Sequence, residues 1–492
     1  MNHSLTKKLI IFSTGWNFIG NFIPLIVGLF AIPLLIKGMG TDRFGLLTLL
    51  WMGLGYFSVF DFGLGRALTK FVSEKANNFE NKADIQIIWT ALIVLSVIGL
   101  LFSIFLLVFS DPLLEKLLPT SSIIQDEGLI SLRLLALGIP IVSLSAGLIG
   151  ILEGFQSFKI IALIRMPLGV MTFLAPLITL QFTENIGWIV FSLLICRLLA
   201  LFAFLYALLA QKPLLLRFFS LSLTGIKPLV AFGGWVTVSN IIAPLLTYLD
   251  RFYIGPFLGL ANLAYYTVPY DILIRLQIVP QSIMGAIFPT MVENKNSNIN
   301  KYEKIYKVAG KIAFYTMLPA ISFIFLLAPE WLTFWLGDDF SEKSCVVVKI
   351  LCIGWLVNLT AQNGILSIIG DGRPDLISKL YLVEIAPYLF LLLYLSEKFG
   401  INGVAAAWAI RVSSDAFIVN LLVYARSYHL RGAVTHSFFI IFLIGVFSLV
   451  LWNIDGIFIK ATILLSISII SLVIILNLLG VNFYKKKSTI KN

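Results

Sequence analysis

The sequence predicts an all-α, polytopic membrane protein made of two similar halves. Apolar residues make up 59% of the chain and charged residues only 12%, whereas soluble domains are about 45–50% apolar and about 25% charged. Apolar runs of about 20 residues, the length that crosses a bilayer core, recur along the whole chain. The heptapeptide GWNFIGN at 15–21 returns almost unchanged as GWVTVSN at 234–240.

The apolar runs predict fourteen transmembrane helices. The first run follows Lys7 and Lys8 and continues to Ile36, which is longer than the core of a cleaved signal peptide, so we interpret it as a retained spanning helix. The expected helices are 9–36, 44–64, 85–109, 128–153, 158–181, 186–210, 228–257, 262–291, 308–328, 346–369, 375–396, 401–424, 437–453 and 457–481.

The distribution of positive charge predicts that both termini are cytoplasmic. With the N-terminus inside, the inner segments hold about 23 Lys and Arg residues and the outer loops about six, as the positive-inside rule requires. The net charge of +11 is therefore mostly topological, and it does not support a nucleic-acid partner. The outer loops are short, and no soluble domain is expected on either side of the membrane.

Metal, cofactor and thiol chemistry are not expected. The three histidines lie outside the apolar runs, and the three cysteines form no CxxC motif. Cys345 and Cys352 are seven residues apart and share a helical face, which is typical of small buried apolar residues. We expect no cofactor and no metal site.

The repeat divides the chain. A constant offset carries Gly15, Trp16 and Asn21 onto the second heptapeptide, and the same offset carries Gly40 onto Gly259. An offset of 216 carries Arg133 onto Lys349, Gly138 onto Gly354 and Gly154 onto Gly370, while Arg197 and Arg411 share a similar mid-helix depth. Six helices separate the copies, which predicts a parallel repeat with the solute path between the halves.

This division predicts four parts. They are a six-helix lobe at 1–210, an amphipathic cytoplasmic linker at 211–227, a second six-helix lobe at 228–424, and two further helices with a basic tail at 425–492. The linker mixes Leu and Phe with Lys212, Arg217 and Lys227, a composition that suits a helix lying on the membrane surface.

Charges inside the spans are the candidate site residues. Each costs about 2.5–3.5 kcal/mol at a helix centre, so such residues usually face a cavity or a partner. Asp271 with Arg275, and Arg411 with Asp415, have i,i+4 spacing and can pair along one helix. Arg133, Arg197 and Lys349 have no acidic residue within a turn, and snorkelling of Arg133 and Lys349 to the outer interface is the alternative to a cavity.

A cavity lined with positive charge needs an anionic cargo. Arg binds phosphate with its planar fork and Lys binds it as a point charge. We expect the cationic cavity to include Arg133, Arg197, Arg251, Arg275, Lys349 and Arg411. The candidates for ion coupling are Asp61, Asp271, Glu384 and Asp415, and we favour Glu384 because it has no basic residue within one helical turn.

The first two predicted helices carry a family likeness. A Pro-containing first helix is followed by a turn from Gly38 to Leu46 and by an aromatic helix that ends in DFGLGRA, from Asp61 to Ala67. This pattern resembles the polysaccharide-transport (Wzx-type) flippases of the multidrug/oligosaccharidyl-lipid/polysaccharide exporter (MOP) superfamily. The likeness extends from the N-terminus through the repeat and ends near Leu430.

The resemblance implies two six-helix lobes around a central cationic cavity and no enzymatic activity. It implies flipping of undecaprenyl-pyrophosphate-linked oligosaccharides from the inner to the outer leaflet of the bacterial inner membrane, driven by ion gradients or membrane potential. The cargo would serve O-antigen, capsule or exopolysaccharide synthesis, and a polymerase with its chain-length machinery would be the protein partner. The last two helices depart from the common twelve-helix pattern and resemble, by position only, the extra pair of lipid II flippases.

Two other functions compete with the flippase. A drug or cation exporter of the same superfamily would favour central acidic residues over so many arginines. A membrane glycosyltransferase or polysaccharide polymerase would need a sizeable outer loop, whereas the predicted outer loops are at most about 18 residues long.

The predicted topology can be tested by cysteine labelling. Cysteine introduced at Asn78 or Asn298 should react only with a reagent supplied from the cytoplasm, and cysteine at Asp338 only from outside, because the charge distribution places these loops on opposite faces. Labelling of all three from one side would disprove the fourteen-helix topology.

Overall fold

The computed structural model describes residues 3–56, 63–75, 81–117, 122–217, 245–452, 454 and 456–478. Side chains of residues 3–22 and of a few other positions are not included. Every regular element in the described residues is helical, which confirms the predicted fold class. The chain divides into two compact units, residues 1–264 and 265–492.

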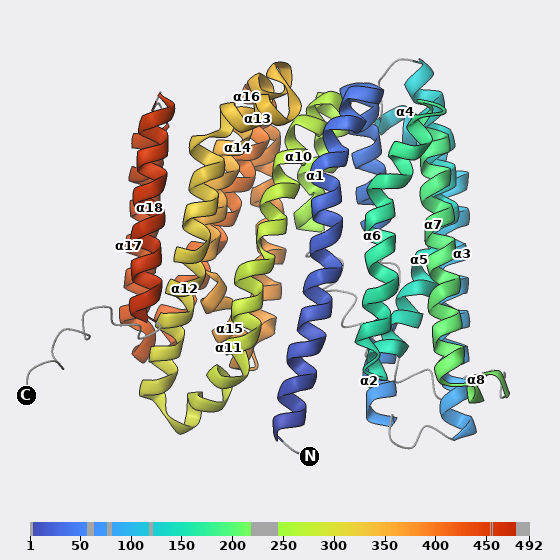
Figure 1. The fold of residues 1–492 in the computed structure, drawn as a ribbon, viewed down its shortest axis with the longest axis horizontal. Coiled ribbons are helices and arrows are strands. Elements are labelled where there is room, and N and C mark those ends of the chain that lie inside the picture. The colour runs from blue at the N-terminus through green and yellow to red at the C-terminus, as the bar shows by residue number, and fades with distance from the viewer. Residues whose placement is uncertain are drawn as a thin grey trace, which may run out of the picture. The chain divides into compact units, whose positions relative to one another are not determined.

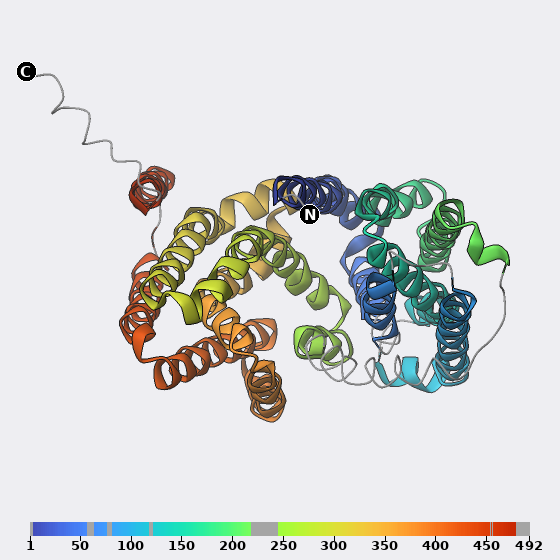
Figure 2. The same cartoon turned by 90° about the horizontal axis from the view of Figure 1, so that it is seen from below.

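The first unit consists of long helices that run side by side (Figure 1). Figure 2 shows them end-on. A further helical stretch covers 245–258, and the start of α10, Leu260–Leu276, closes the unit. The labelled helices are α1 (His3–Tyr56), α2 (Leu64–Lys75), α3 (Lys82–Val108), α4 (Ser110–Leu117), α5 (Ser122–Gly154), α6 (Phe158–Leu180), α7 (Ile186–Gln211) and α8 (Leu214–Arg217).

The second unit contains the remainder of α10 and the helices after it. The longest, α16, covers Pro374–Arg426, and a 3₁₀ turn at Tyr428–Leu430 follows it. The others are α11 (Ile278–Ser297), α12 (Ile299–Leu326), α13 (Ala328–Leu336), α14 (Asp338–Leu359), α15 (Gln362–Gly370), α17 (Arg431–Leu451) and α18 (Ile457–Leu478).

Two glycines divide helices that are otherwise continuous. Gly40 in α1 has φ 82° and ψ 165°, and Gly400 in α16 has φ 57° and ψ −136°. A Cβ atom is strongly disfavoured at these angles, so glycine permits the break. Both breaks fall in short outer loops predicted from the sequence, between 9–36 and 44–64 and between 375–396 and 401–424.

The break at Gly400 folds α16 back on itself. A straight helix would hold Glu384 and Arg411 about 40 Å apart, at 1.5 Å per residue, yet these side chains form an ion pair. The two arms pack closely near the break, because a Cβ on Gly403 would lie 1.9 Å from the carbonyl oxygen of Leu395.

The backbone carries signs of the repeat. Gly259, the repeat equivalent of Gly40, also has a positive φ, of 99°. At the offset of 216, Gln156 with φ 57° matches Gly372 with φ 71°, each in the turn before a long helix. The amide of Ala261 donates a hydrogen bond to its own repeat equivalent, Asp42, so two equivalent positions contact each other within the first unit.

The core of the first unit joins α2, α3, α5 and α7. Its fully buried side chains include Leu68, Ile85, Ile88 and Leu95. A Cβ on Gly150 of α5 would lie 2.2 Å from the carbonyl oxygen of Gly65 in α2. The missing side chain therefore allows α2 and α5 to approach closely, and both helices line the cavity described below.

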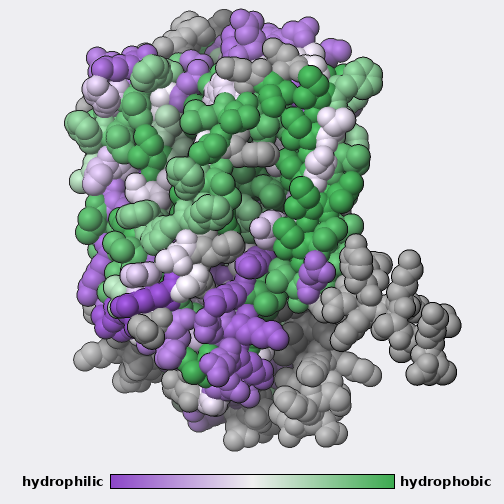
Figure 3. All heavy atoms as spheres, turned by 90° about the vertical axis from the view of Figure 1, so that its left-hand side faces the viewer, coloured by the Kyte–Doolittle hydropathy of each residue, from purple (hydrophilic) through white to green (hydrophobic). Residues whose placement is uncertain are grey.

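The outer surface of the helices is apolar. Many large hydrophobic side chains are exposed, among them Phe30, Leu101, Phe202 and Phe390. Figure 3, which shows the face that carries α17 and α18, has hydrophobic residues across the middle and hydrophilic residues towards both ends. Nine helical stretches of the described residues are long and apolar enough to cross a membrane. The total of fourteen stays a prediction.

Some predicted features lie wholly or mostly outside the described residues. These are the second heptapeptide, most of the 211–227 linker and the basic tail. The side chains of the first heptapeptide are not described either. The four-part division therefore stays a prediction beside the observed boundary between residues 264 and 265.

Candidate functional site

Three arginines line a cavity within the first unit. The cavity has a volume of about 380 Å³ and lies among α2, α5, α6 and α7. Arg66 comes from α2, Arg165 from α6 and Arg197 from α7, and Glu153 at the end of α5 is the one acidic residue in its lining. The remainder of the lining is small or apolar apart from Thr69 and Ser145.

The cavity has an excess of positive charge. Arg165 Nη2 lies 3.6 Å from Glu153 Oε1, so one cation is compensated. Neither Arg66 nor Arg197 forms an ion pair with any described residue. The lining therefore carries a formal charge of about +2, on guanidinium groups whose geometry suits phosphate and carboxylate oxygens.

Arg133 does not line this cavity. Its guanidinium donates to both carboxylate oxygens of Asp111 in α4, at 3.1 and 3.0 Å, and this hydrogen bonding holds the pKa of the Asp111 carboxyl below its usual range. The sequence suggested an unpaired cation because Asp111 lies on a different helix, far outside one helical turn. Because both side chains are about half exposed, solvent screening leaves the pair a minor contribution to stability.

Lys349 is held by the end of α17. Its ammonium donates to the carbonyl oxygen of Trp452 at 2.9 Å and lies 5.3 Å from the Trp452 ring centroid and 5.8 Å from that of Phe325. Lys349 is therefore also not free, because a carbonyl and two aromatic faces replace the acidic partner that the sequence lacks.

Arg251 is buried in the first unit beside Asp250. The two side chains are 2% and 0% exposed, and the Arg251 guanidinium lies 5.3 Å from the ring centroid of Tyr248. Asp250 accepts a hydrogen bond from the Arg251 backbone amide at 2.8 Å. Neither residue lines the arginine cavity.

The second unit contains a buried charged cluster on the two arms of α16. Arg411 Nη1 lies 3.5 Å from Glu384 Oε2, and the guanidinium lies 5.2 Å from the ring centroid of Tyr388. Glu384 and Asp415 are 7% and 4% exposed. The i,i+4 ion pair expected between Arg411 and Asp415 does not form, because Arg411 pairs with Glu384 instead.

The remaining predicted residues are less informative. Asp271 and Arg275 lie one turn apart on α10 and are both partly buried. Asp61 lies outside the described residues. Of the six cations expected to line one cavity, the structure therefore places Arg197 in the arginine cavity and pairs Arg133, Lys349 and Arg411 elsewhere.

The sequence reasoning did not select Arg66 or Arg165 for the cavity. Arg66 lies at the predicted cytoplasmic end of the second helix, where a basic residue is explained by the positive-inside rule alone. A signal was present, because Arg66 belongs to the DFGLGRA motif quoted above. Arg165 counts among the charges inside the spans, but nothing in the sequence brings it near Arg197.

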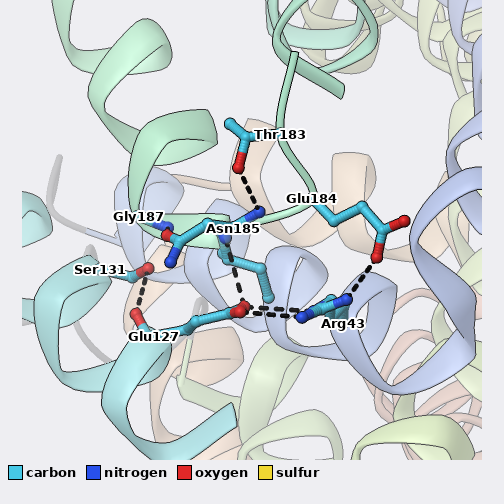
Figure 4. A network of polar contacts seen from close by, with 8 residues as sticks. Arg43, Glu127, Ser131, Thr183, Glu184, Asn185 and Gly187 are labelled. Atoms are coloured by element: carbon cyan, nitrogen blue, oxygen red, sulfur yellow. Dashed lines mark hydrogen bonds and ion pairs between the residues drawn. The ribbon is translucent and has the colours of Figure 1, made fainter. Parts of the chain in front are cut away.

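A polar clamp fixes α5 and α7 at the end far from the cavity (Figure 4). Arg43, just after the break in α1, forms ion pairs with Glu127 at 2.9 Å and with Glu184 at 2.7 Å. Glu127 lies in the second turn of α5, and one of its oxygens also accepts a hydrogen bond from the backbone amide of Ile186, the first residue of α7. The clamp therefore joins the ends of three helices, two of which line the cavity.

The sequence matches the family model of the "Polysaccharide biosynthesis protein" family over residues 11–295. The chain belongs to this family. It is also 28% identical over 420 residues to the "Putative O-antigen transporter" of Shigella flexneri, covering 84% of this chain and 97% of that protein. The family likeness noted in the sequence is thereby confirmed.

Solved structures support the fold. A MOP superfamily transporter from Pyrococcus furiosus aligns with a TM-score of 0.62 at 17% identity, covering 86% of this chain and 96% of the other. An inward-facing multidrug resistance transporter of the MATE family aligns with a TM-score of 0.69 at 18% identity, covering 85% and 98%. The chain thus has the fold of multi-pass membrane transporters of this superfamily, and its relatives are transporters rather than enzymes.

No cluster of His, Cys, Asp and Glu suited to a metal ion occurs among the described residues. The two charged assemblies considered for function below are the arginine cavity of the first unit and the α16 cluster of the second.

A double-mutant cycle tests the buried pair of α16. Arg411→Met should destabilise the purified protein by about 3–5 kcal/mol, because it leaves two buried carboxylates without a cation. Glu384→Gln should destabilise it less, because Asp415 stays near Arg411. The double variant should lose clearly less than the sum of the two. Unfolding in denaturant, followed by tryptophan fluorescence in detergent, measures these losses.

The exposed Asp375 and Lys379 pair on the same helix is the control. Its cycle should give a much smaller coupling, because solvent screens an exposed pair. Strictly additive effects at Glu384 and Arg411 would show that the ion pair does not stabilise the fold.

Proposed function

We propose that the protein flips lipid-linked oligosaccharides from the inner to the outer leaflet of the bacterial inner membrane, and that the arginine cavity binds the pyrophosphate of the lipid carrier. The observation that carries the proposal is the excess of positive charge in this cavity. The matched family and the name of the Shigella flexneri relative point to a surface polysaccharide as the end product. Undecaprenyl-pyrophosphate is the carrier that the family likeness implies.

Electrostatics explains why a carrier of this cargo needs such a cavity. A pyrophosphate loses its hydration when it leaves water, and an uncompensated charge in low dielectric is prohibitively costly. Arg66 and Arg197 supply two cations without an ion-pair partner among the described residues. Arg165 supplies a third cation, which would leave its ion pair with Glu153 and bind the phosphate when cargo enters.

The proposal includes a direction and a mechanism. The positive-inside distribution favours cytoplasmic termini, and the cargo would enter from the inner leaflet, where lipid-linked sugars are assembled. The repeat fits a carrier whose two lobes expose the site alternately to the two leaflets. A polysaccharide polymerase and chain-length machinery would receive the product at the outer leaflet.

The α16 cluster is the proposed coupling site. Glu384 and Asp415 are two buried carboxylates that share one neighbouring cation, Arg411. Because both are buried, proton uptake by one of them would remove a costly charge. We assign the coupling role to Glu384, since its protonation would release Arg411 and so link proton binding to the contact between the two arms of α16.

Removing the free cations of the cavity should abolish flipping. Arg197→Ala and Arg66→Ala should each reduce transport at least tenfold, because a hydrogen bond to a charged group contributes about 1.5–3 kcal/mol. Arg197→Lys should keep part of the activity if the positive charge matters more to cargo binding than the bidentate hydrogen bonding of a guanidinium. Complementation of a flippase-deficient strain measures transport, and immunoblotting of membranes measures abundance.

Arg133→Ala is the matched control, because it removes a cation that is paired with Asp111 outside the cavity. It should complement nearly as well as the unmodified protein. Full complementation by the Arg66→Ala/Arg197→Ala double variant at normal abundance would refute the cargo site.

Replacing Glu384 should change how transport depends on pH. Glu384→Gln imitates the protonated carboxyl, so transport by this variant should be slower and should no longer respond to the proton gradient. Uptake of lipid-linked sugar into vesicles at several internal and external pH values measures both effects. Asp375→Asn, which removes an exposed carboxylate of α16, is the control, and an unchanged pH profile for Glu384→Gln would refute the assignment.

A further inference from the structure

Two cavities of the second unit join into one elongated site. The first has a volume of about 310 Å³ and adjoins the first half of α12, and the second has about 350 Å³ and follows the rest of that helix. Phe314 and Ile440 line both cavities, so the two cavities adjoin each other. The combined site lies between α12, α14 and α17, with one contact each from α15 and α18.

One end of this site is polar and positively charged. Lys307 and Lys311 line it, and Lys307 pairs with Glu303 on its own helix. Lys311 is partly buried and has neither an ion pair nor a hydrogen bond with the residues that the structure describes. One positive charge is therefore left for a ligand.

Two buried polar groups at the same end also have unused hydrogen-bonding capacity. Tyr306 is 3% exposed, and its hydroxyl has no partner within the described part of the chain. Asn363 is 7% exposed and donates to the carbonyl oxygen of Tyr306 at 2.9 Å, while its own side-chain oxygen accepts nothing there. A buried polar atom without a partner is unfavourable, so a polar group at this end of the site would be stabilising.

The other end is a hydrocarbon-lined groove. It follows α12 from Phe314 to Phe325, a distance of about 16 Å along the helix axis. The lining also includes Leu318, Ile353, Leu356, Leu443, Leu451 and Ile467. The site as a whole thus has a cationic end and an apolar length, as an anionic amphiphile does.

We propose that this is a binding site for an anionic phospholipid of the surrounding membrane. The phosphate lies at Lys311, Lys307 and the Tyr306 hydroxyl, and one acyl chain occupies the groove along α12. Charge complementarity selects an anionic headgroup over a zwitterionic one. The length of the groove suits one acyl chain better than a long polyprenyl chain.

The proposal is independent of the cargo site. No residue of this lipid site lines the arginine cavity, which belongs to the first unit. The bound lipid would pack α17, a helix outside the repeat, against α12 and α14 and so stabilise the second unit.

The experiment measures the melting temperature of the purified full-length protein in mixed micelles. Phosphatidylglycerol should raise it saturably, whereas phosphatidylcholine at the same mole fraction should not. Lys311→Gln should weaken the apparent affinity for phosphatidylglycerol at least tenfold. Lys304→Gln is the matched control, because Lys304 is an exposed lysine of α12 that lines neither cavity.

A second pair of variants tests the groove. Leu443→Trp should fill the groove and abolish the response to lipid. Leu449→Trp should not, because Leu449 of the same helix is 79% exposed and does not line the groove. Leu318→Trp, from the opposite wall, replaces Leu443→Trp if that variant does not fold.

Three results would overturn the proposal. They are equal stabilisation by phosphatidylglycerol and phosphatidylcholine with no effect of Lys311→Gln, equal stabilisation by inorganic phosphate alone, and competitive binding of undecaprenyl phosphate at least tenfold tighter than phosphatidylglycerol. The last result would identify the groove as a site for the cargo lipid.

Discussion

The compensation of charge inside hydrocarbon is the constraint on which the rest of the structure depends. Arg411 is neutralised by Glu384, and this is possible only because the break at Gly400 folds α16 back on itself. Lys349 is satisfied by the end of α17. Against this background Arg197 is an exception, since it has no acidic partner among the described residues and lines a cavity. A cation without an acidic partner where others are paired is the feature on which the proposed cargo site rests.

The two copies of the repeat use a similar position differently. Arg197 lies eleven residues into α7, and Arg411 lies ten residues into the second arm of α16, counted from Ile186 and Ile401. The first faces a cavity, and the second is held by a carboxylate. In the proposed function, cargo binding belongs to one copy and titration to the other, and a single acidic residue on a neighbouring segment decides whether the cation is available.

The sequence predicted more of the fold than of the site. Helix type, the short loops in which the breaks at Gly40 and Gly400 fall, and the family all follow from local patterns, namely the length of apolar runs and a short motif. The cavity of six cations stays a prediction, because the pairing of charges depends on distances between helices that the sequence does not give. Asp111 reaches Arg133 from another helix, and Glu384 reaches Arg411 from the other arm of α16. Neither contact has a signature at helical spacing. Arg66 was missed because it lies in a predicted cytoplasmic segment, where the positive-inside rule already accounts for a basic residue.

Gln156 shows that the two halves of the repeat can agree in backbone conformation where they differ in sequence. In an alignment of the two halves, Gln156 against Gly372 is a mismatch, yet both residues have a left-handed backbone at the same turn. Both turns have this geometry whichever amino acid occupies them, because the packing of the helices on either side determines how the turn must run. Torsion angles therefore agree between the two halves at a site where the amino acids differ, and halves of other transporters with low mutual identity can be compared in the same way.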